Sequence, residues 1–244
     1  RRNEEIEVLI MVNTFEVSIG DIPESRVIST NSTSFPLVIT PSSYSPSALP
    51  VSTHMESSND DTLPSQLSHY LTTHREYLIK SLIKHGAILF RGFPIESPFL
   101  FLDFIECFDF VNFPYVGGNA VRRKIVGDRI FTTNESPPDK KIPFHHELAQ
   151  TQNAPSKLLF YCVTPAASGG QTPIVHSVEL YERLIELFPD FVHKLEQFGV
   201  VYSRVMKEED RAESAIGRGW KATFNVNNRD ELEMLLKEKG EKCE

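Results

Sequence analysis

The chain has 244 residues, a formal net charge of −8 and a hydrophobic content of 40%. This length suits one large mixed or all-β domain or two small ones, with enough apolar residues for a sizeable core. The acidic balance disfavours nucleic-acid binding, which needs clustered Lys and Arg, and no run of about 18 apolar residues predicts a membrane span. The scattered Cys107, Cys162 and Cys243 lack zinc-site spacing and indicate free thiols in a reducing, cytoplasmic compartment.

The N-terminal part of the chain is poor in signals for regular structure. We predict a poorly ordered lead-in over residues 1–34, within which Met11 is an alternative start. A Ser- and Pro-rich stretch covers residues 41–64, where the prolines disfavour helix and central strand. Between the two, Phe35–Thr40 predicts a short strand.

The next elements carry clearer patterns. Leu67 to Leu82 repeats apolar residues at three- and four-residue steps, which predicts one amphipathic helix that stops at Gly86. Gly86–Pro94 predicts a short buried strand. Ser97 and Pro98 are suited to the cap and first turn of a helix, whose core stripe we expect to be Phe101, Leu102, Ile105 and Phe108.

Two more short strands are expected at Ile125–Val126 and Ile130–Thr132, after a basic cluster at Arg122, Arg123 and Lys124 that we interpret as a solvated loop. The second half then alternates strands and helices. Strands are predicted at 157–163, 171–175 and 200–206, and Gly169 and Gly170 supply a positive φ between the first two. Helices are predicted from Ser177, from Pro189 to Gly199, and from the capping box of Asn228 and Glu231 to Lys239, while 207–219 is a charged loop.

One stretch, Ile142–Ala149, carries metal-type ligands. His145 and Glu147 are two residues apart, and Pro143 favours a strand over a helix here. In a strand, side chains at i and i+2 point to the same face with Cα atoms roughly 6.6 Å apart, so both could bind one ion. His146 would then point the other way, toward packing or a hydrogen bond.

Alone, this triplet is weak, because a His-x-Glu pair occurs often by chance as a solvated pair at a strand end. A zinc hydrolase is disfavoured, since the chain has no His-Glu-x-x-His spacing.

Four motifs in a fixed order add context to the triplet. They are Gly86–Pro94, Tyr115–Gly118, Asn134–Pro138 leading into Phe144–Glu147, and Gly169–Pro173. Together they resemble the plant clavaminate synthase-like proteins, which belong to the taurine dioxygenase superfamily of iron(II)- and 2-oxoglutarate-dependent oxygenases. The resemblance runs from about Phe35 to the last helix, and ordered motifs are more specific than any one of them.

The resemblance implies a double-stranded β-helix (jelly roll) flanked by helices, so we expect a mixed α/β chain in which 35–244 is the N-terminal portion of that domain. It implies that His145 and Glu147 bind Fe(II), since the metal site of this family is a His-x-Asp/Glu pair plus a distant histidine. Thr172 matches the threonine that helps to hold the cosubstrate 2-oxoglutarate. Without the family context, a cross-strand threonine with a satisfied hydroxyl is an equal alternative.

The chain departs from the family in its last part. The third ligand and the arginine that binds 2-oxoglutarate lie near the C-terminus in the family, whereas the only histidines after Glu147 are His176 and His193, which we assign to structural roles. We therefore expect a truncated oxygenase that oxidises a small-molecule C–H bond when complete and is inactive as 1–244. The alternative is a non-catalytic protein that acts by association or has no function. Neither the substrate nor the oligomeric state follows from the sequence.

Overall fold

The computed structural model describes residues 15–29, 31–42, 62–135, 137, 139–151, 153–211, 214 and 216–240. Residues 1–14 and 30 of the expected lead-in, and most of the Ser- and Pro-rich stretch, lie outside these residues. The chain divides into two compact units, one ending at Asp109 and one beginning at Phe110.

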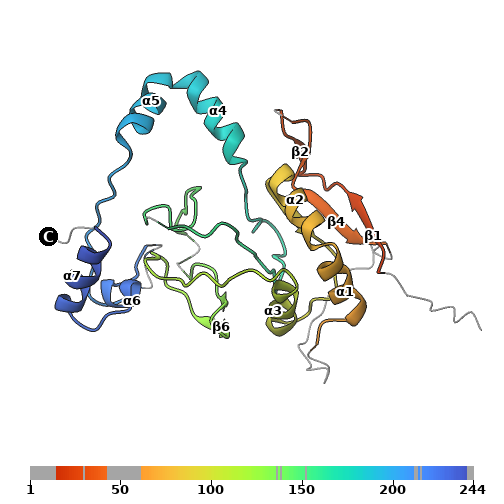
Figure 1. Ribbon diagram of the computed structural model, residues 1–244, viewed down its shortest axis with the longest axis horizontal. Coiled ribbons are helices and arrows are strands. Elements are labelled where there is room, and N and C mark those ends of the chain that lie inside the picture. Colours follow the sequence, from red (N-terminus) through yellow and green to blue (C-terminus); the bar gives the residue numbers. More distant parts are fainter. Residues whose placement is uncertain are drawn as a thin grey trace, which may run out of the picture. The chain divides into compact units, whose positions relative to one another are not determined.

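A three-stranded sheet forms the centre of the first unit (Figure 1). Its middle strand, β4 (Leu37–Pro41), pairs antiparallel with β1 (Val17–Gly20) and parallel with β5 (Ile88–Phe90). Leu37, Val38 and Ile39 are consecutive and each at most 3% exposed, as expected for a strand covered on both faces. The strand expected at Phe35–Thr40 is therefore confirmed. The strand expected within Gly86–Pro94 is also present, as β5, but its residues are half-buried where we expected a buried strand.

A two-stranded ribbon of β2 (Arg26–Val27) and β3 (Ser34–Phe35) completes the strands of this unit. Both β1 and β2 fall inside the 1–34 lead-in, where we predicted no regular structure. Their partners β4 and β3 stabilise them, and local composition does not report such pairing.

Two helices replace the single helix that we predicted before Gly86. They are α1 (Ser65–Thr73) and α2 (Arg75–His85), and α2 packs against β4 and β5 (Figure 1). The break falls at His74, whose Nδ1 donates to the Tyr70 carbonyl at 2.9 Å and whose ring stacks on Tyr70. The end of α2 agrees with the prediction, because Gly86 takes the left-handed conformation with φ of 73°.

The third helix, α3 (Pro98–Glu106), begins where the sequence predicts. The Ser97 hydroxyl accepts a hydrogen bond from the Leu100 amide at 3.2 Å, and Pro98 occupies the first turn. Phe104, which was missing from the predicted stripe, is 3% exposed. Its ring meets the Phe90 ring edge-on, with 5.1 Å between the two ring centroids. An aromatic cluster therefore joins α3 to β5.

In the second unit, the hairpin of β6 (Lys124–Val126) and β7 (Ile130–Phe131) is confirmed. The helices α4 (Ser177–Leu187) and α5 (Pro189–Phe198) also agree with the prediction, although His176 rather than Ser177 is the cap of α4. Further on, α6 (Trp220–Phe224) was not predicted, and α7 (Arg229–Glu238) begins at the expected capping box.

Three predicted strands, 157–163, 171–175 and 200–206, are not strands in the structure. Their apolar side chains are exposed instead, with Phe160 at 65%, Val201 at 90% and Val205 at 93%. A strand requires a neighbour that accepts its backbone hydrogen bonds, and the described residues provide none to these segments. The prediction failed because periodicity reports apolar faces and not partners.

The chain is thus mixed α/β, as predicted. The largest sheet among the described residues has three strands, so the arrangement does not confirm a double-stranded β-helix. Within the same residues, no helix has the length and apolar character needed to cross a bilayer.

Candidate metal site

The segment that carries His145 and Glu147 is not the strand that we predicted, because 142–146 have no regular structure and a turn begins at Glu147. Leu148 takes a left-handed φ of 57°, which ends any extended run. The backbone then bonds locally, because the Thr151 amide donates to the Leu148 carbonyl at 2.9 Å. Backbone groups that a strand would use to pair with a neighbouring strand form hydrogen bonds inside the turn. The expectation that His145 and Glu147 point to the same face rested on strand alternation, so it does not apply here.

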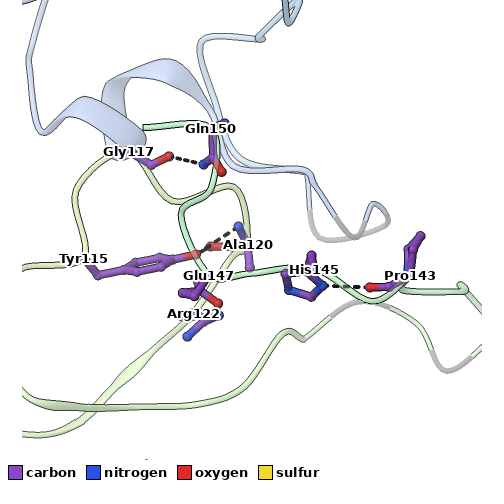
Figure 2. Close-up of polar contacts among 8 residues, drawn as sticks. All are labelled: Tyr115, Gly117, Ala120, Arg122, Pro143, His145, Glu147 and Gln150. Carbon is purple, nitrogen blue, oxygen red and sulfur yellow. Dashed lines mark hydrogen bonds and ion pairs between the residues drawn. The ribbon is translucent and has the colours of Figure 1, made fainter. Parts of the chain in front are cut away.

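His145 is fixed by its own backbone. Its Nδ1 donates to the Pro143 carbonyl at 2.7 Å (Figure 2), and a carbonyl can only accept, so the proton is on Nδ1. The other ring nitrogen, Nε2, has no partner among the described residues and carries the lone pair when the imidazole is neutral. This is the tautomer that metal-binding histidines adopt, with one nitrogen bonded to a backbone carbonyl and the other free for the ion.

Glu147 is held by an arginine from 25 positions earlier in the chain. Arg122 Nη2 donates to Glu147 Oε2 at 2.9 Å, and the two side chains are 21% and 14% exposed. Every other ion pair of the described residues has at least one side chain that is more than half exposed. Oε1 accepts no hydrogen bond among these residues, so one carboxylate oxygen is available to a ligand.

The Arg122 guanidinium also lies 4.6 Å from the centre of the Tyr115 ring, and Arg218 lies 5.0 Å from the same ring. The Tyr115 hydroxyl accepts from the Ala120 amide at 3.2 Å (Figure 2). Burial raises the pKa of Tyr115, so its ring stays neutral at physiological pH and attracts both cations through its π face. Burial also lowers the pKa of Arg218, and the charge of Arg122 adds to this effect.

A second bridge joins the Glu147 turn to the loop at 115–120. Gln150 Nε2 donates to the Gly117 carbonyl at 2.8 Å (Figure 2), and the Gly117 amide donates to Thr223 in α6. A Cβ at Gly118 would lie 2.1 Å from the Tyr115 ring. Only glycine fits this close approach, so Gly118 allows the Tyr115 ring to pack against Arg122.

The other candidate residues lie apart from this cluster. His146 Nε2 is hydrogen-bonded to Ser177 Oγ at 2.8 Å, consistent with the predicted non-ligand role. Thr172 is exposed, in a segment without strand structure, and no contact within the described residues joins it to His145 or Glu147. Gly169 and Gly170, just before it, do have the positive φ that we predicted.

The two histidines assigned to structure have structural positions. His176 Nδ1 accepts from the Glu179 amide at 3.4 Å as the cap of α4, and His193 lies inside α5. Among the described residues, no group of three or more His, Cys, Asp or Glu could hold a metal. His145 and Glu147 nevertheless suit a first-row metal in donor type, because one nitrogen and one oxygen remain unpaired.

The sequence did not indicate the role of Arg122. We expected a solvated loop, which agrees with Arg123 and Lys124, 73% and 65% exposed, but is wrong for Arg122. A partly buried carboxylate needs a charged partner. That rule predicts that some cation contacts Glu147, but the chain offers 25 lysines and arginines, and no local pattern selects among them.

Residues 45–227 match the family described as Taurine catabolism dioxygenase TauD, TfdA family. The chain is 49% identical over 174 residues to a clavaminate synthase-like protein of Arabidopsis thaliana, covering 71% of this chain and 52% of that protein. It is also 28% identical over 163 residues to the dapdiamide synthesis protein DdaC of Enterobacter agglomerans, covering 67% of this chain and 46% of DdaC. The chain belongs to the TauD/TfdA family and spans about half the length of the curated relatives it matches.

Proposed function

We propose that this chain contributes to an iron(II)- and 2-oxoglutarate-dependent oxygenase that oxidises a C–H bond of a small molecule, with His145 and Glu147 as two of the metal ligands. The observation that carries the proposal is the pairing of both side chains. His145 uses Nδ1 and Glu147 uses Oε2 in contacts to the protein, so that Nε2 and Oε1 have no partner within the described part of the chain. Membership of the family supports this assignment.

The bound iron and 2-oxoglutarate would supply the oxidising chemistry with molecular oxygen as the oxidant: one oxygen atom would end in the succinate that forms with carbon dioxide from 2-oxoglutarate, and the other in the oxidised substrate. The residues of this chain would bind and orient. His145 and Glu147 would hold the ion through neutral imidazole and carboxylate, and Arg122 would keep the Glu147 side chain in place. Thr172 is the candidate for a hydrogen bond from its hydroxyl to 2-oxoglutarate.

We further propose that the segments 157–163, 171–175 and 200–206 are strands of a jelly roll once partners are present. Their exposed apolar side chains support this, because Phe160, Val201 and Val205 are each at least 65% exposed. Such residues are normally covered in a folded domain.

The same proposal holds that 1–244 alone does not turn over 2-oxoglutarate. His176 and His193 have structural positions at α4 and in α5, which leaves His145 and Glu147 as the candidate ligands among the residues that the structure describes, and metal affinity depends on ligand number and geometry. The test supplies purified 1–244 with iron(II), ascorbate, 2-oxoglutarate and oxygen. We expect no succinate above a His145→Ala control, and succinate that depends on His145 would show that another residue completes the site.

A second candidate function is association without catalysis. The exposed apolar residues of 157–163 and 200–206 favour it, because large apolar side chains that face solvent are groups that a partner can cover. It differs from the first proposal in needing neither a metal nor His145, so a metal-binding measurement separates the two.

A further inference from the structure

In the proposed site, Arg122 contacts Glu147. Its surroundings indicate that its role is to hold the carboxylate of that residue. Its Nη2 donates to Glu147 Oε2 at 2.9 Å, while its Nε is buried and has no hydrogen-bond partner among the described residues. A guanidinium carries five N–H donors. Here the guanidinium is held by one carboxylate oxygen and by the face of the Tyr115 ring.

Several contacts hold the Tyr115 ring and the loop at 115–120, against which the Arg122 guanidinium lies. The Tyr115 hydroxyl is bonded to the Ala120 amide, and Gly118 permits its backbone to lie against the ring. The turn after Glu147 is bridged to the same loop by Gln150 and Gly117. The cation and the carboxylate are therefore attached independently to one loop, so the geometry of their contact is set from both sides.

We infer that Arg122 is a positioning residue, which clamps Oε2 of Glu147 so that Oε1 is presented to the metal ion together with Nε2 of His145. This inference rests on the proposed function. A carboxylate held by one oxygen binds a metal through the other, and partners that orient a ligand in this way typically contribute 10- to 100-fold to metal affinity or activity, as an order of magnitude.

Two effects of Arg122 on the ion oppose each other. Its positive charge repels a divalent cation, and its hydrogen bond removes rotational freedom from the ligand. The partner of Arg122 is the ligand Glu147 itself, so their pairing reduces the charge of the arginine and of the carboxylate together. We expect the positioning effect to exceed the repulsion, so that loss of Arg122 weakens metal binding.

The test is a titration of the 244-residue chain with Co(II), followed by the visible absorption of the bound ion. Arg122→Met should weaken Co(II) binding by about 10- to 100-fold, and Arg122→Lys should recover part of the loss. The matched control is Arg123→Met, because the neighbouring arginine is 73% exposed and pairs with Glu135 instead. That control should bind Co(II) within about twofold of the parent chain.

A double substitution distinguishes a positioning role of Arg122 from a general loss of structure in the variant. If Arg122 acts through Glu147, adding Arg122→Met to a Glu147→Gln chain should weaken Co(II) binding by no more than about twofold further. An equal loss in both backgrounds, or no loss from Arg122→Met in the parent chain, would overturn the positioning role. If neither His145→Ala nor Glu147→Gln weakens Co(II) binding, the proposed function fails, and the inference fails with it.

Discussion

Gly118 is the residue on which the geometry around Arg122 depends most closely. Its Cα lies against the ring of Tyr115, the ring lies beneath the Arg122 guanidinium, and that guanidinium holds Glu147. Each contact limits the freedom of the next. The position of one carboxylate oxygen is therefore traced through three contacts to a residue without a side chain.

Replacing Gly118 by alanine should destabilise the protein, because the new Cβ would meet the Tyr115 ring at 2.1 Å. Overpacking of this kind costs about 1–3 kcal/mol in the free energy of unfolding, measured by urea denaturation. Gly20→Ala is the control, since nothing lies within 4 Å of its Cβ position, and it should change stability by less than about 1 kcal/mol. Equal stability of the Gly118→Ala chain and the parent would contradict this packing.

Thr172 remains a prediction from the family resemblance. Thr172→Val keeps the shape of the side chain and removes the hydroxyl, so it should weaken binding of 2-oxoglutarate to the Co(II)-loaded chain. A hydrogen bond to a charged group contributes about 1.5–3 kcal/mol, which corresponds to at least a tenfold rise in the dissociation constant. The change in Co(II) absorption on adding 2-oxoglutarate measures it, with Thr164→Val as the control. Unchanged affinity would remove Thr172 from the site.

At the scale of elements, the helix ends are explained by local chemistry. Ser97 accepts from the Leu100 amide, and Asn228 and Glu231 bond each other and the first turn of α7. These groups satisfy amides that have no partner within the helix. Because the chemistry lies within four residues, the sequence predicted the starts of α3 and α7.

Ser97→Ala should therefore lower the free energy of unfolding by about 1 kcal/mol, because the Leu100 amide loses its acceptor. Ser97→Asp keeps an acceptor and places a negative charge at the helix N-terminus, so it should retain nearly the parent stability. Thermal unfolding of the three chains gives the comparison. A destabilised Ser97→Asp chain would show that the hydroxyl does more than cap α3.

The strands show where local reasoning stops. The hairpin of β6 and β7 and the short β5 were predicted, whereas 142–149, 157–163, 171–175 and 200–206 were expected as strands and are not. A helix closes its hydrogen bonds within itself, but a strand depends on a partner that can be far away in sequence. The pair His145 and Glu147 stays a prediction as a metal site, and the contact of Glu147 to Arg122, which is equally non-local, was missed.

At the scale of the whole molecule, exposed apolar surface is the dominant feature of the second unit. Val201 and Val205 are more than 89% exposed, and Phe160 is 65% exposed. Unpaired extended segments with such side chains favour association. We expect the sedimentation coefficient of 1–244 to rise with concentration in the micromolar range.

A variant with lysine at Phe160, Val201 and Val205 should reduce that concentration dependence, because charges on exposed segments oppose pairing. The control places lysine at the exposed Ile83 and Tyr77 of α2, in the first unit. A parent chain that sediments as a monomer at every concentration would contradict this expectation.

The central claim is that His145 and Glu147 bind one metal ion, and the most direct test detects the histidine nitrogen at the metal. The chain is loaded with Mn(II) and examined by pulsed electron paramagnetic resonance for coupling to a single ¹⁴N nucleus. We predict one imidazole coupling that is lost in His145→Ala and retained in His146→Ala, whose imidazole is bonded to Ser177. A coupling that survives His145→Ala, or disappears only with His146→Ala, would contradict the assignment.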